Sequence, residues 1–153
     1  MGLAIALHIL AAVIWVGGMF FAVVCLRPAL GFIDPPLRLR IWSGVLSRFF
    51  RWAWASAAVL LITGVWMVFG FFQGLKHVGV HVQFMLGLGI FMMLLLAHVY
   101  SAPYKRLKRL IAQSNWPEAA KQTNQIRWFI GVNLALGLLV AVIGASGRYW
   151  TAG

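Results

Sequence analysis

The first 26 residues carry no formally charged side chain. This run, MGLAIALHILAAVIWVGGMFFAVVCL, ends at Arg27-Pro28. Roughly 20 apolar residues cross a bilayer as a helix, at about 1.5 Å per residue. The run is therefore long enough to span, and its ionisable side chains are His8 and Cys25. A polar group inside a membrane is costly unless it has a partner, so His8 is a functional candidate by default.

The composition indicates a membrane protein. Of the 153 residues, 63% are hydrophobic, with two acidic side chains against thirteen Lys and Arg. A soluble domain of this size cannot bury so much apolar surface. A net charge of +11 would point to nucleic acid in a soluble protein. Here the cationic residues lie beside apolar runs, so we expect anionic lipid as the partner and no nucleic acid.

The N-terminal run is not typical of a cleaved signal peptide. No Lys or Arg precedes it, and it ends in Cys-Leu-Arg-Pro rather than at a small-residue cleavage site. We expect a retained helix. Cys25 is the single cysteine, which excludes an internal disulfide or a CxxC redox pair.

Charged residues divide the chain into four uncharged runs, each long enough to span. This pattern predicts one all-α transmembrane domain over residues 1–153, a four-helix up-down bundle. The expected helices cover residues 2–26, 52–75, 78–102 and 128–147, joined by basic amphipathic connections at 27–51 and 103–127. Gly137 and Gly144 are seven residues apart and share one face of the last helix, where glycine allows close helix approach.

The basic residues also predict an orientation. Eleven of the thirteen Lys and Arg lie in the two connections, and Lys76 and Arg148 lie on the other side. By the positive-inside rule, both termini and the Lys76 turn should be on the outer side. In a Gram-negative bacterium this is the periplasmic side of the inner membrane.

Few side chains could perform chemistry. The carboxylates are Asp34 and Glu118, both in the connections. The lack of acids in the spans argues against a carboxylate-coupled ion pump and against paired-acid hydrolysis. No buried Ser-His-Asp set can be assembled either. The histidines remain, and they are His8, His77, His81 and His98.

Two histidines lie at similar depth. His8 precedes Pro28 by twenty residues, and His81 precedes Pro103 by twenty-two, so their depths differ by roughly 3 Å. Their helices run the same way and are diagonal in an up-down bundle, roughly 13 Å apart. That gap suits two imidazoles holding one planar metal macrocycle. We therefore expect one haem b, ligated by His8 and His81 near the outer face, with an electron-transfer or redox role.

The predicted cofactor site has apolar walls at helical offsets from the two histidines. The candidates are Trp15, Met19, Phe84, Met85 and Leu88. Gln83 could hydrogen-bond a ligand's free nitrogen or a propionate. Asn133 is a polar group in the fourth run, with His98 or a backbone carbonyl as candidate partner.

Copper is the alternative metal. His77 and His81 are four residues apart, so on one helix they would share a face. Soft side chains that copper(I) could use are Met19, Met85, Met92, Met93 and Cys25. A third interpretation is a non-catalytic assembly subunit whose polar residues only hold helices together.

Several short motifs resemble a known family. They are HILAAVIWVGG at 8–18, SRFF at 47–50, Thr63-Gly64 and YKRL at 104–107. With these motifs the sequence resembles the copper-resistance protein D (CopD) family and, more distantly, the HemJ-type protoporphyrinogen oxidases.

The two resemblances imply different chemistry. The CopD likeness implies copper handling, often with a periplasmic copper-binding partner. The HemJ likeness implies haem b, a redox activity and an essential first-helix histidine, here His8. Where HemJ-type proteins carry a lysine early in the third helix, this chain has His81 and Gln83. That replacement favours two-histidine haem ligation over protoporphyrinogen oxidation, and a haem-dependent membrane oxidoreductase is the enzyme it would imply.

Overall fold

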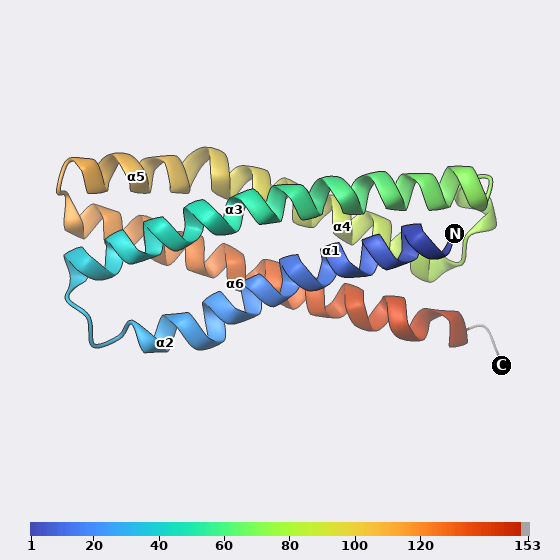
Figure 1. Ribbon diagram of the computed structural model, residues 1–153, viewed down its shortest axis with the longest axis horizontal. Helices are drawn as coiled ribbons and strands as arrows, with labels where there is room; N and C mark the ends of the chain where they lie inside the picture. Colours follow the sequence, from blue (N-terminus) through green and yellow to red (C-terminus); the bar gives the residue numbers. More distant parts are fainter. Residues whose placement is uncertain (151–153) are drawn as a thin grey trace.

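Four long helical segments lie side by side and run alternately up and down (Figure 1). The computed structural model describes residues 1–150. By length and composition, four segments can cross a membrane, namely Gly2–Ala29, Pro35–Phe71, Val80–Ala112 and Trp116–Ser146. The described chain is thus an all-α, multi-pass membrane bundle, which confirms the predicted fold class.

Each segment is built from one or more helices. They are α1 (Gly2–Phe20), α2 (Arg27–Ala29), α3 (Pro35–Val65), α4 (Val80–Val99), α5 (Lys105–Ala112) and α6 (Trp116–Ser146). Short π-helical stretches continue the first three segments at Phe21–Leu26, Trp66–Phe71 and Tyr100–Tyr104. Pro103 lies in the last of these, where a residue without an N–H breaks the regular hydrogen-bond ladder.

Two helices begin well before the starts expected at residues 52 and 128. Prolines in the first turn of α3, after Asp34, begin that helix at Pro35. Asn115 caps α6, its side-chain oxygen accepting a hydrogen bond from the Glu118 N–H at 3.4 Å, with Pro117 in the first turn. Most of both basic connections therefore continues the spanning helices.

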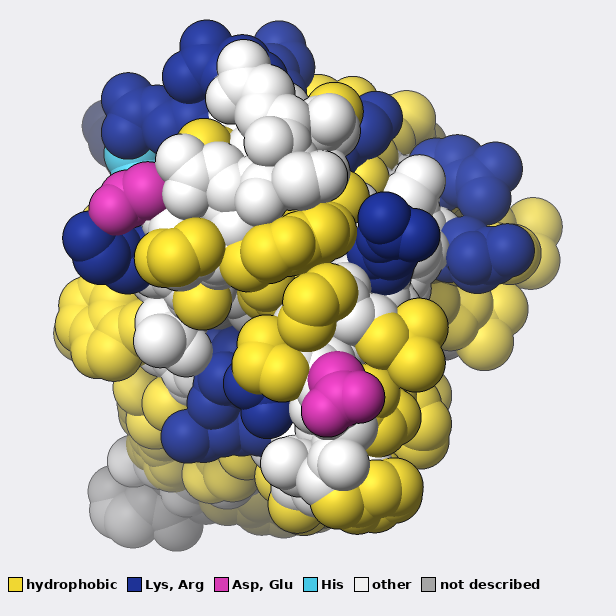
Figure 2. Space-filling model, turned by 90° about the vertical axis from the view of Figure 1, so that its left-hand side faces the viewer, with side chains coloured by type: hydrophobic (Ala, Val, Ile, Leu, Met, Phe, Trp, Pro, Cys, Tyr) yellow, Lys and Arg dark blue, Asp and Glu magenta, His cyan; other side chains and the backbone are white. Residues whose placement is uncertain are grey.

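The two ends of the bundle differ in chemistry. The start of α1, the turn between α3 and α4, and the end of α6 lie together, and we call this the histidine end (Figure 1). The α2–α3 loop and the α5–α6 turn form the opposite end, which we call the basic end. Figure 2 views the basic end and shows Lys and Arg around it with few acidic groups. Which end faces the periplasm stays a prediction from the charges.

The helices pack in a skewed square. α1 packs on α3 and α6, α4 packs on α6, and α3 also contacts α6 across the bundle. The α3–α6 pair is thus the close diagonal, with α1 and α4 at the other two corners. The core lies mainly in the basic half, where Trp15, Met19, Phe50 and Ile126 are almost fully buried.

Glycines on α6 allow the close approach of its neighbours. An added Cβ at Gly137 would lie 2.8 Å from Cγ2 of Val16 and 3.2 Å from Cε of Met92. One at Gly144 would lie 3.0 Å from Cε of Met85. The predicted face of small residues is therefore a packing surface for α1 and α4.

Gly137→Leu should destabilise the bundle by about 1–3 kcal/mol, because the new side chain must push Val16 and Met92 aside. Gly131→Leu is the matched control, since an added Cβ there meets nothing within 4 Å. Thermal unfolding in detergent measures the difference. Equal melting temperatures for the two variants would contradict the close packing at Gly137.

Candidate functional site

His8 is joined to α3 by a hydrogen bond within the membrane-spanning part of the bundle. Its ring is half-buried, and Nδ1 lies 2.7 Å from the hydroxyl oxygen of Thr63. An added Cβ at Gly64 would lie 3.5 Å from Cε1 of His8, so the imidazole packs closely against the α3 backbone. The partner that a histidine in a spanning helix requires is thus Thr63.

The hydroxyl of Thr63 is also hydrogen-bonded to its own helix. It donates to the Val59 carbonyl at 2.6 Å, with the Leu60 carbonyl at 3.3 Å. When the hydroxyl proton lies toward Val59, the hydroxyl oxygen accepts from Nδ1–H of His8. In that tautomer Nε2 of His8 keeps its lone pair, which is the arrangement of a metal-ligating histidine.

His81 is engaged elsewhere. Its ring lies against Gly79 and Gly147, with no room for a Cβ at either glycine. The ring centroids of His81 and Trp150 are 6.5 Å apart in an edge-on arrangement. His81 thus packs on the end of α6, while His8 packs on α3.

His77 does not share a helix with His81. Val78 and Gly79 are extended, and α4 begins only at Val80. His77 closes a short 3₁₀ turn and is exposed. The four-residue spacing therefore does not place the two rings on one helical face.

Gln83 and Met85 also have partners in the fold. The Gln83 amide donates to the Leu75 carbonyl at 3.1 Å, which ties α4 to the preceding turn. Met85 packs against Gly144 of α6. The proposed ligand-facing roles of both residues stay predictions.

Trp15 and Met19 belong to the packed core. They are 2% and 1% exposed, and the cavity that they line with Asn133 measures about 10 Å³. The indole Nε1 of Trp15 and Oδ1 of Asn133 are buried without a hydrogen-bond partner among the described residues. This space is far too small for a porphyrin.

Haem b held by two histidines is therefore not supported by this arrangement. His8 and His81 pack against different helices, and the predicted porphyrin walls at Trp15 and Met19 are closed. His98 is exposed, with its ring 5.3 Å from that of Phe129.

A closed metal site of hard or borderline ligands is also absent from the described residues. No group of three or more His, Cys, Asp or Glu side chains there could hold a metal ion. What the site offers is one oriented imidazole on α1, together with His81, Met85 and Met92 on the side of α4 that faces α6.

The sequence reasoning missed the role of Thr63. A hydroxyl in the second uncharged run was the available signal, since polar groups in spans need partners. The register that brings Thr63 to His8 could not be predicted from the sequence, because it is set by the packing of α1 against α3.

Thr63→Val should lower stability by about 1–3 kcal/mol, because it removes the acceptor for the His8 Nδ1–H. Thr123→Val is the matched control, since the Thr123 hydroxyl donates only to Ala119 of its own helix at 3.0 Å. ¹⁵N NMR of the imidazoles gives a second measurement. The wild type should show His8 protonated at Nδ1, and a His8 protonated at Nε2 would contradict the assignment.

Comparison with known proteins supplies a family. A family model described as Copper resistance protein D matches residues 43–146, well over half of the chain. The match includes Thr63 and His81 and leaves α1, with His8, outside it. No curated protein and no solved structure matches. A likeness to protoporphyrinogen oxidases is not shown. The chain belongs to the copper resistance protein D (CopD) family and is a multi-pass membrane protein of copper-resistance type.

Proposed function

We propose that this protein binds copper(I) within the membrane as cargo and that Nε2 of His8 is its principal ligand. The observation that carries the proposal is the His8–Thr63 hydrogen bond, backed by the Thr63 contacts to Val59 and Leu60. A metal-binding histidine commonly donates its other ring N–H to a fixed acceptor, which orients the ring and raises its basicity.

The nature of the other donors favours copper(I) over harder ions. Thioether ligands favour copper(I) and imidazole also binds copper, whereas carboxylate and water suit magnesium, calcium or manganese. His81, Met85 and Met92 line the face of α4 that packs on α6. We assign these three side chains as further donors spaced along this face of α4, with the two methionines supplying the soft thioethers.

The predicted orientation indicates from which side of the membrane a copper ion would reach the site. If the histidine end faces the periplasm, as the positive-inside rule predicts, His8 lies near the outer surface. The exposed His77 would then be a donor at the entrance, and a periplasmic copper-binding protein is the partner that would deliver or accept the ion.

Nε2 of His8 would also serve as an axial ligand of a haem iron. Haem b with a redox activity is the other use of this nitrogen, although His81 packs on the end of the last span and is not its second ligand in this arrangement. An absorption spectrum separates the two, because haem gives an intense Soret band and copper(I) gives none.

His8→Ala should weaken copper(I) binding by more than the roughly 10–100-fold that loss of a ligand's orienting partner costs, because it removes the oriented Nε2 itself. The measurement is anaerobic competition between the purified, detergent-solubilised protein and a chromophoric copper(I) chelator. Thr63→Val should weaken binding by a smaller factor, since it leaves the ligand but not its orientation.

His98→Ala is the matched control, because His98 is an exposed imidazole on the same bundle, packed on Phe129. Its affinity for copper(I) should equal that of the wild type. Equal affinity of the wild type and His8→Ala would contradict the role of His8. A red wild-type protein with a Soret band that disappears in His8→Ala would instead support haem.

A further inference from the structure

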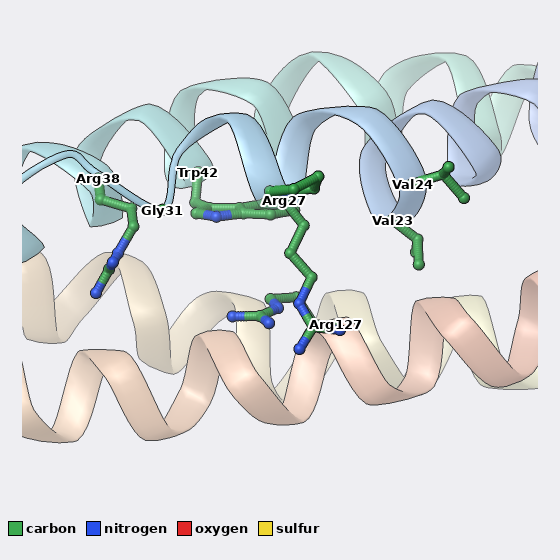
Figure 3. Close-up of a pocket in the computed structure, with 8 residues that line it drawn as sticks. Val23, Val24, Arg27, Gly31, Arg38, Trp42 and Arg127 are labelled. Atoms are coloured by element: carbon green, nitrogen blue, oxygen red, sulfur yellow. The ribbon is translucent and has the colours of Figure 1, made fainter.

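A cavity of about 500 Å³ opens between the first and last spans near the basic end. Three arginines from three different segments line it. Arg27 begins α2, Arg38 lies in the first turn of α3, and Arg127 lies on α6. Figure 3 shows Arg27 reaching from its helix toward α6, where its guanidinium group lies beside that of Arg127.

These positive charges have no acidic partner in the described part of the chain. The ion pair there joins Lys121 to Glu118 at 2.6 Å, and Asp34 makes none. Arg127 donates to the Asn124 side chain at 3.1 Å, but its Nε is buried without a hydrogen-bond partner. Arg27 and Arg38 are also close enough for their charges to act on Arg127. Like charges gathered in this way repel unless an anion lies between them.

We propose that this cavity binds a phosphate group through the guanidinium groups of Arg27, Arg38 and Arg127. Guanidinium groups present paired N–H donors whose geometry matches phosphate oxygens. The buried ring of Trp42 and the Gly31 backbone form the adjoining wall. This is a built site on three segments, distinct from basic side chains scattered over a lipid-facing surface.

The rest of the lining points to a phospholipid as the source of the phosphate. Val23 and Val24 line the cavity one turn farther from the basic end. A lipid headgroup at Arg27 could therefore lay the start of its acyl chain along these valines. The site lies at the end of the bundle where the charge pattern predicts the membrane interface.

The test is thermal unfolding of the full-length protein in detergent, with phosphatidylglycerol, phosphatidylcholine or inorganic phosphate added in separate arms. Phosphatidylglycerol should raise the melting temperature of the wild type. Arg27→Gln should weaken the apparent affinity about tenfold, through the loss of one charge-assisted contact. Because Arg27 is exposed, this variant should fold even where Arg127→Gln does not.

Arg106→Gln is the matched control, because Arg106 is exposed on α5 at the same end and does not line the cavity. It should retain the wild-type response. Stabilisation by inorganic phosphate that depends on Arg27, with no added effect of lipid, would support a free phosphate as the ligand. Lipid stabilisation equal in wild type, Arg27→Gln and Arg106→Gln, or no stabilisation in any arm, would overturn the site.

Discussion

The close packing of α4 against α6 decides which side chains of this bundle remain available to bind a ligand. Inside a bilayer, lipid tails solvate apolar side chains about as well as another helix does, so helices associate through close packing and polar pairs. Gly137 and Gly144 of α6 supply that packing, together with Gly147 directly after the helix, and Met92, Met85 and His81 lie against them in that order. Two of the side chains expected to face the haem, His81 and Met85, are therefore already packed against the last span and the residue that follows it.

A polar pair plays the corresponding part on the other side of the bundle. Thr63 is bonded to its own helix and accepts from His8, so α1 is fixed to α3 at one level. This arrangement satisfies one nitrogen of the imidazole and leaves the other free. A single oriented imidazole suits a transiently bound copper(I) ion better than a resident macrocycle with two axial ligands.

The two ends thus have complementary chemistry. The histidine end holds His8 and His81 and carries little charge, whereas the basic end gathers around one cavity three arginines that have no acidic partner among residues 1–150. Phosphate bound there would bridge the first, second and last spans, and so would stabilise the α1–α3–α6 packing that positions His8. The lipid proposal and the copper proposal concern separate sites and can succeed or fail independently.

The sequence by itself determined the membrane class, the number of spanning helices, the diagonal placement of the first and third spans, and His8 as a polar group in need of a partner. These follow from run length, charge distribution and the cost of polar groups in lipid, which are local properties. Only the tertiary structure decided that His8 meets Thr63, that His81 packs on Gly147, and that Arg27, Arg38 and Arg127 converge. Helix rotation and register decide these contacts, and both depend on packing between segments far apart in the chain, where uniform apolar faces leave no periodic signal to read.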